Sequence, residues 1–270
     1  MKSAEKKITV LMALKDASST MDISIRSVIE QKYSNFDLIF SVADSNDDTL
    51  NKLEKIAESF PVKLILNQNE GIYHALNSGL NAADPESLVC ILGSGDFFLH
   101  DRVFDLVNRD LRNSGDWCIS PWVLTESNYE FVEVSGLQDF SGSEVLTTRV
   151  PLCHQSVFAE AQMMNAVGKF KPRYRVAADR DLIFKLWKNR APIVLNTVNV
   201  VYPQGGFSSH NEIQGHKELK NLYRSNLIKY PFLKPSIRRN LQTKGKYLEN
   251  MIPNNIFPWC PSSVLAGVTN

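Results

Sequence analysis

The sequence lacks any closely spaced cysteine pair. Its four cysteines are far apart, at positions Cys90, Cys118, Cys153 and Cys260. This spacing argues against a zinc site built on CxxC pairs and against a disulfide framework. We therefore expect reduced thiols in a reducing compartment.

Long hydrophobic runs and an excess of charge of one sign are missing as well. The apolar run that follows the charged first residues, Ile8 to Leu14, is too short for a signal peptide and far too short to span a bilayer. A formal net charge of +1 gives no reason to expect nucleic acid as a partner. Hydrophobic residues make up 43% of the chain, which is ample for a packed core. We expect a soluble, cytoplasmic protein.

What the sequence does contain is an alternation of short apolar runs with segments of helical periodicity. This pattern is typical of a mostly parallel sheet flanked by helices. The predicted strands are 8–14, 37–43, 62–66 and 88–92. The predicted helices are one opened by a capping box at Ser19 and Asp22, one around 50–57, one over 71–82 and one over 103–111.

Beyond position 116 the alternation loosens. The pattern predicts strands over 116–121 and 129–134, a polar loop region over 136–150, a helix over 179–189 and a β-rich run over 193–202. From about His210 the chain is basic and helical. The predicted organisation is a catalytic domain over 1–210 and a helical C-terminal extension over 211–270.

Acidic or glycine-rich segments follow three of the predicted strands. They are 44–49, 67–71 and 93–96. In open α/β sheets, ligands bind beyond the carboxyl ends of strands, and carboxylates there can hold Mg²⁺ or Mn²⁺ together with substrate phosphates. The alternative is that Asp44 and Asp47 cap the next helix and that Asp96 lies in a turn.

These segments belong to a series of motifs in a familiar order. The series is SVIEQKY at 27–33, DSNDDT at 44–49, GIYHALNSG at 71–79, LGSGD at 92–96, HQ at 154–155, DRDL at 179–182 and GGFS at 205–208. It resembles family 2 glycosyltransferases of the GT-A fold, especially bacterial polysaccharide and O-antigen enzymes. The resemblance covers roughly residues 7–210. It implies a Rossmann-like, mostly parallel sheet and the transfer of a sugar with inversion.

The resemblance also implies roles for individual residues. Asp96 would contact Mn²⁺ or Mg²⁺ on the diphosphate of the donor, Asp179 would be the general base, and His154 with Gln155 would lie on the acceptor or diphosphate side. The implied donor is a nucleotide sugar, with a UDP-sugar favoured, and the acceptor is a glycan or a lipid-linked sugar. The residues implied to bind the nucleotide sugar are Asp44, Asp47, Asn69, Gly71, Asn77, Ser94 and Asp96.

The chain departs from the family pattern in several places. The acidic loop is two residues shorter than usual, so either Asp44 or Asp47 can take the nucleotide-binding role. His74 stands where the family commonly has aspartate, and Ser94 fills the first acidic position of the metal-binding motif. Asp96 is then the one carboxylate left in that motif, which can suffice for Mg²⁺ when phosphates and water complete the shell.

Helical spacing distinguishes Asp179 from Asp181. Asp179 lies three and four positions before Leu182 and Ile183, so it continues the apolar face of the helix. Asp181 is in line with Lys185 and is expected to form a solvated ion pair. For His154, a core position is the alternative to a role in the site.

Two further alternatives concern function. The basic C-terminal stretch carries an apolar stripe at Leu219, Leu222, Tyr223 and Leu227, which favours either contact with an anionic membrane or packing on the catalytic domain. A sugar nucleotidyltransferase would need a glycine-rich loop after the first strand, where this chain has residues 15–19 without glycine. A third alternative is a degenerate homologue that binds a nucleotide sugar or a partner protein without turnover.

Overall fold

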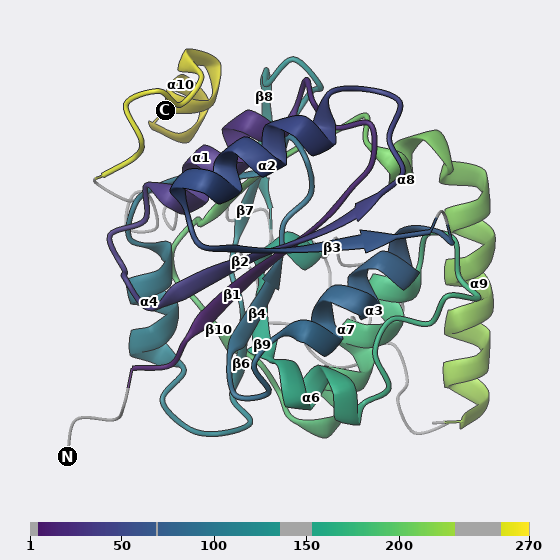
Figure 1. Ribbon diagram of the computed structural model, residues 1–270. Coiled ribbons are helices and arrows are strands. Elements are labelled where there is room, and N and C mark those ends of the chain that lie inside the picture. Colours follow the sequence, from purple (N-terminus) through teal and green to yellow (C-terminus); the bar gives the residue numbers. More distant parts are fainter. Residues whose placement is uncertain (1–4, 69, 136–152, 230–254, 270) are drawn as a thin grey trace.

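The computed structural model describes residues 5–68, 70–135, 153–229 and 255–269. In this part of the chain a seven-stranded sheet runs in the order β10-β6-β9-β4-β1-β2-β3 (Figure 1). Only β9 is antiparallel to its neighbours, so the sheet is mostly parallel, as predicted. Its strands are β1 (Ile8–Leu14), β2 (Phe36–Ala43), β3 (Val62–Asn67), β4 (Leu88–Ile91), β6 (Trp117–Ile119), β9 (Val157–Glu160) and β10 (Ile193–Val194).

Helices cover both faces of this sheet because alternate strand residues point to opposite sides. On β1, Val10 and Met12 belong to one buried cluster and Leu11 belongs to the other. The first cluster is covered by α1 (Met21–Ile29), α2 (Thr49–Ser59) and α4 (Val103–Asp110). The second is covered by α3 (Ile72–Ala82), α6 (Ala161–Ala166) and α7 (Ala178–Asn189), as Figure 1 shows.

A second, four-stranded sheet has the order β5-β11-β7-β8. Its strands are β5 (Phe97–Phe98), β11 (Val200–Pro203), β7 (Trp122–Thr125) and β8 (Phe131–Ser135). The C-terminal helix α10 (Ser262–Thr269) packs on it through Val264 and Val268. Sequence reasoning missed β7, since three of its four residues are buried and give no polar alternation.

Some local predictions lie outside the described residues or are wrong. The loop at 136–150 and Asn69 are among the residues that the structure does not describe. The capping box is wrong, because α1 begins at Met21 with Thr20 as its N-cap. The Asp22 carboxylate instead binds Lys52 Nζ on α2, at 2.9 Å.

The C-terminal stretch continues through α8 (Phe207–His210) into α9 (Glu212–Lys229). On α9, Leu222 is buried, whereas Lys217, Lys220 and Arg224 are exposed. The apolar stripe therefore packs at least partly on the rest of the protein, and contact with a membrane stays a prediction. Within the described ranges, no helix combines the length and apolar character that crossing a bilayer requires.

Gly79 allows α3 to pack closely against β1. A Cβ at this position would lie 2.1 Å from Cδ1 of the fully buried Leu11. We expect Gly79→Ala to lower the free energy of unfolding, because overpacking costs about 1–3 kcal/mol and outweighs the gain in helix propensity, about 1 kcal/mol or less. Urea unfolding measures the change. His74→Ala on the exposed side of the same helix is the control, and a Gly79→Ala protein as stable as that control would contradict the prediction.

Candidate active site

Asp96 is held in one orientation at the end of the loop after β4. The side chain is 5% exposed, and its Oδ2 accepts hydrogen bonds from Gly93 N at 3.0 Å and Gln155 Nε2 at 2.7 Å. Gly93 is required here, because a Cβ would lie 2.4 Å from Oδ2. Gln155 is oriented in turn by Cys153, whose thiol donates to Oε1 at 3.0 Å. Both donors bind Oδ2, so Oδ1 is the oxygen that can face a ligand.

Burial makes this carboxylate unusually basic. Desolvation raises the pKa of Asp96 to about 6, although the hydrogen bond from Gln155 and the nearby His154 act in the opposite direction. At neutral pH the Asp96 carboxylate is therefore ionised, and burying this charge lowers the stability of the folded protein. Such a cost is common at functional sites, where a bound cation or substrate offsets it.

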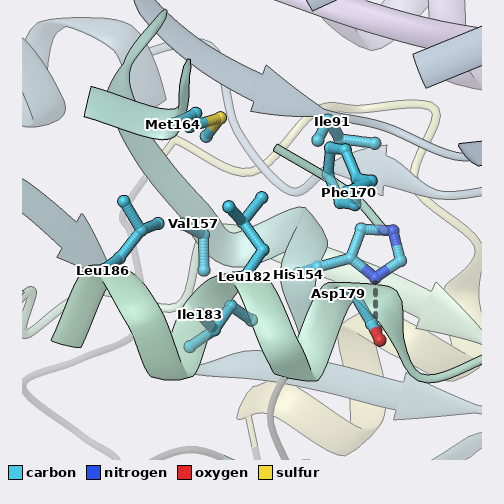
Figure 2. Close-up of a pocket in the computed structure, with 9 residues that line it drawn as sticks. All are labelled: Ile91, His154, Val157, Met164, Phe170, Asp179, Leu182, Ile183 and Leu186. Atoms are coloured by element: carbon cyan, nitrogen blue, oxygen red, sulfur yellow. Dashed lines mark hydrogen bonds and ion pairs between the residues drawn. The ribbon is translucent and has the colours of Figure 1, made fainter. Parts of the chain in front are cut away.

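Asp179 lies at the start of α7, where its carboxylate meets His154. Oδ2 is 3.2 Å from His154 Nδ1 (Figure 2). Oδ1 accepts a hydrogen bond from Arg180 N at 2.7 Å. The Asp179 side chain is 19% exposed. Burial raises the pKa of Asp179, but His154 and Arg180, through hydrogen bonds and charge, outweigh it and bring the pKa below its usual value. Asp179 is thus an ionised base at neutral pH that solvent can reach.

A pocket of about 250 Å³ opens beside Asp179. His154, Gln155 and Asp179 line it together with apolar and aromatic side chains. The residues that complete its walls are Trp122, Leu124, Glu133, Ser135, Cys153, Val176, Ala177, Arg180, Tyr202, Ser208 and Leu219. The small apolar pocket drawn in Figure 2 has a volume of only about 10 Å³, which holds a water molecule at most. The larger pocket is therefore the candidate substrate site.

The turn that carries His154 and Gln155 joins the two carboxylates. These residues form a single 3₁₀ turn, η1 (His154–Ser156), directly before β9. His154 contacts Asp179, while Gln155 contacts Asp96. The alternative of a purely structural core histidine does not fit, because His154 lines the pocket.

The acidic loop after β2 separates Asp44 from Asp47. Asp47 accepts hydrogen bonds from Ser18 N at 2.9 Å and from Thr49 N at 3.0 Å, and also binds the Thr49 hydroxyl. The Thr49 hydroxyl is the main reason that the pKa of Asp47 lies below its usual value. Asp47 thus fastens the loop after β1 to the loop after β2. Asp44 lies directly after β2 and is exposed. Which of the two carboxylates binds the nucleotide stays a prediction.

Three other predicted residues have mainly local roles in the structure. Gly71 is the N-cap of α3 with a φ of 107°, a backbone conformation that favours glycine. Asn77 binds Phe170 with both ends of its amide, at 2.8 and 3.1 Å, and is not brought to the pocket. Ser94 shares a 2.5 Å hydrogen bond with the hydroxyl of Thr20.

The structure also corrects the environment of Asp181. The predicted ion pair with Lys185 is present, but the Asp181 side chain is 6% exposed and therefore buried, not solvated. Sequence reasoning missed other pocket residues too. Arg180 lies inside the DRDL motif and could have been found there, whereas Trp122 and Tyr202 carry no sequence signal of their own.

The side chains that the structure describes do not by themselves form a complete metal site, so a bound cation would need further ligands from the substrate. Among the described residues, no three His, Cys, Asp or Glu side chains gather as a metal site. Asp96 offers a hard oxygen ligand of the kind that Mg²⁺ and Mn²⁺ prefer. These cations are commonly bound through one or two carboxylates plus substrate phosphates and water, so the residues fit that kind of site.

Comparisons with known sequences identify the family of the chain. The profile of glycosyl transferase family 2 matches residues 9–147. A PGL/p-HBAD biosynthesis glycosyltransferase of Mycobacterium tuberculosis is 22% identical over 212 residues, 77% of each chain. The UDP-Glc:alpha-D-GlcNAc-diphosphoundecaprenol beta-1,3-glucosyltransferase WfgD of Escherichia coli is 25% identical over 122 residues, 45% of this chain and 47% of that protein.

Solved structures share the fold. S. aureus TarS 1-349 in complex with UDP-GlcNAc has a TM-score of 0.66 at 16% identity, covering 82% of this chain and 66% of that one. Mannosyltransferase PcManGT from Pyrobaculum calidifontis, in complex with GDP-Man and Mn²⁺, has a TM-score of 0.59 at 16% identity, covering 83% and 64%. The chain thus spans slightly less than two thirds of these solved chains. Because the family profile covers just over half of the 270 residues, the chain belongs to glycosyl transferase family 2 and is a glycosyltransferase of the GT-A fold.

Proposed function

We propose that this chain transfers a sugar from a nucleoside diphosphate donor to a hydroxyl group of a glycan or lipid-linked acceptor, in the assembly of a cell-surface polysaccharide. The proposed reaction inverts the anomeric carbon and depends on Mn²⁺ or Mg²⁺. The observation that carries the proposal is the turn at His154 and Gln155, which links Asp179 beside the pocket to Asp96 in the loop after β4.

On the acceptor side, Asp179 accepts the proton of the attacking hydroxyl. The acceptor oxygen then forms a bond to the anomeric carbon, and the bond from that carbon to the diphosphate breaks, with its electron pair leaving on the diphosphate. A base that acts on the acceptor hydroxyl supports a single displacement, which inverts the anomeric centre. His154 binds the Asp179 carboxylate and orients it for this step.

On the donor side, Asp96 would hold the divalent cation through its free oxygen, and Asp44 would contact the nucleoside at the end of β2. When bound, the cation would neutralise charge on the departing nucleoside diphosphate. Gly93 and Gln155 orient Asp96 before any ligand arrives, so little reorganisation is needed on binding.

A uridine nucleotide is the favoured donor. Support comes from the names of two similar proteins, the TarS complex with UDP-GlcNAc and the E. coli enzyme that uses UDP-Glc. PcManGT in complex with GDP-Man and Mn²⁺ has the same fold with a different nucleotide, so the base must be tested directly.

A thermal-shift screen with Mn²⁺ present tests the donor. We expect UDP to raise the melting temperature more than GDP or dTDP. At a concentration of about 100 times Kd, binding stabilises the folded state by about 2.7 kcal/mol, which corresponds to roughly 5–10 °C for a domain of this size. Nucleoside diphosphate release is then measured with the matching sugar nucleotide and a panel of acceptors.

The outcomes separate the parts of the proposal. A larger shift with GDP would overturn the uridine preference and keep the transferase. Binding that is equal with Mn²⁺ and with EDTA would overturn the metal dependence. The anomeric configuration of the product, determined by NMR, decides between inversion and retention.

A further inference from the structure

Glu218 on α9 is a buried carboxylate outside the motifs that define the family. It is 7% exposed, and a charge so removed from water requires strong partners. Three consecutive backbone N–H groups donate to it, from Arg175 at 2.8 Å, Val176 at 2.9 Å and Ala177 at 3.0 Å. Burial raises the pKa of Glu218, but these donors outweigh it and bring the pKa below its usual value. Glu218 is therefore ionised, and both of its carboxylate oxygens accept hydrogen bonds from the backbone of residues 175–177.

That segment leads directly into the helix of the proposed base. Ala177 is the N-cap of α7, and its methyl group cannot accept the hydrogen bonds that a helix N-terminus offers. Glu218 instead accepts from the N–H group of the N-cap itself and from the two N–H groups before it, and adds a negative charge at the positive end of α7. Asp179 follows two residues after Ala177, so the direction of its side chain depends on where this segment lies.

Other contacts fix the same segment from two more sides. The Tyr73 hydroxyl on α3 donates to the carbonyl of Val176, and Arg175 Nε donates to Asn211 Oδ1 at 2.8 Å. Gln214 Nε2 holds Glu218 Oε1 at 2.8 Å from one turn earlier on α9. The neighbour of Glu218, Leu219, lines the same pocket as Asp179. The C-terminal helix is thus joined to the start of α7 and to the pocket wall.

We propose that Glu218 is a positioning residue for the reaction, which holds residues 175–177 so that the Asp179 carboxylate stays on His154 and beside the pocket. The inference rests on the proposed role of Asp179 as the base. Glu218 contacts the backbone of the segment and acts on the reaction through Asp179. A displacement of about 1 Å at a reacting group can cost about 100-fold in rate, so this kind of support has a large kinetic effect.

The variant Glu218→Gln tests this role. Glutamine has the same size, but its NH₂ group replaces one acceptor oxygen and faces backbone donors. We expect kcat to fall about ten- to a hundredfold, while the donor KM and the Kd of UDP with Mn²⁺ stay within about twofold. Donor contacts at Asp96 and Asp44 do not involve this segment. A purely structural role would instead lower the melting temperature and leave kcat per folded molecule unchanged.

Amide hydrogen exchange gives a readout that does not depend on activity. In Glu218→Gln, exchange at 175–177 should become faster while exchange in β1 and β4 stays the same. The matched control is Glu212→Gln, an exposed carboxylate on the same helix, which should change neither exchange nor kcat. Unchanged exchange at 175–177 in Glu218→Gln would overturn the inference.

The inference and the proposed function can fail separately. Full turnover in Asp179→Asn would refute the base, whatever happens at Glu218. Loss of turnover in Asp179→Asn together with normal kcat in Glu218→Gln would refute the positioning role alone. Should Glu218→Gln not fold, Glu218→Asp keeps the charge but shortens the reach to the three backbone donors, and a kcat equal to that of the unmodified enzyme would then refute the positioning role.

Discussion

Replacing Asp179 with asparagine is expected to lower kcat by about 10²- to 10⁴-fold, the usual contribution of a positioned base. Asparagine keeps the size of the side chain and can still accept the hydrogen bond from Arg180 N. It cannot take a proton from the acceptor hydroxyl. Because the proposed role of Asp179 is on the acceptor side, the Kd of the donor should change little. Initial-rate kinetics together with calorimetric titration of UDP and Mn²⁺ measure the two effects.

Asp181→Asn is the informative control for this variant. Asp181 is the other carboxylate in the first turn of α7, but it is buried against Lys185. Removing one partner of a buried ion pair leaves the other uncompensated, so we expect lower stability with nearly normal kcat. If Asp181→Asn lost turnover and Asp179→Asn kept it, the assignment of the base would have to be reversed.

Replacing Asp96 with asparagine should abolish most activity and, at neutral pH, stabilise the protein. The variant loses the one carboxylate proposed to hold the cation, so we expect at least a 100-fold lower kcat/KM, of the order that metal charge stabilisation supplies. The carbonyl of the introduced asparagine can still accept the hydrogen bonds that Gly93 N and Gln155 Nε2 donate to Asp96. The fold should therefore survive the change.

The stability gain follows from the pKa of Asp96. Burial raises this pKa from the usual 3.8 to about 6, a difference that corresponds to about 3 kcal/mol at most. The folded state binds the proton of Asp96 more tightly than the unfolded state does. The contribution of Asp96 to the free energy of unfolding is therefore greatest below pH 3.8 and declines as the pH rises toward 6. Above pH 6 the full cost of the buried charge remains. A neutral asparagine avoids it, and we expect a net gain of about 1–2 kcal/mol after its NH₂ group is desolvated.

Unfolding experiments without divalent cations can check this sign. Between pH 7 and pH 5, the unmodified enzyme should gain stability relative to Asp96→Asn, and the difference between them should shrink. A variant that is less stable at every pH would show that the hydrogen bonds of Asp96 outweigh the cost of burying its charge. Gly93 and Gln155 would then be stabilising partners rather than only orienting ones.

Much of the fold is predictable because its main sheet follows simple periodicities. The strands β1 to β4 and the helices α3 and α7 begin and end within about one residue of the predicted bounds. The small sheet was harder, because β7 and β11 pair across a long stretch of chain and β7 lacks alternation. Nothing local in the sequence indicates that such segments meet.

The candidate site was predictable to the extent that its residues lie in motifs. Asp96, Asp179, His154 and Gln155 do come together. The sequence could not show that Asp47 binds the neighbouring loop, since its partner Ser18 is far from it along the chain. It also could not show the role of Glu218, because that depends on how α9 packs against the start of α7.

The turn at His154 and Gln155 has a consequence for protein engineering. A single peptide bond separates the side chain that contacts the proposed base from the side chain that orients the proposed cation ligand. A substitution that shifts the backbone of this turn moves both side chains at once. Donor and acceptor preferences are therefore coupled at this turn. New acceptor specificity is better sought at pocket-lining residues outside this turn, such as Trp122 or Leu219, where a substitution leaves this connection intact.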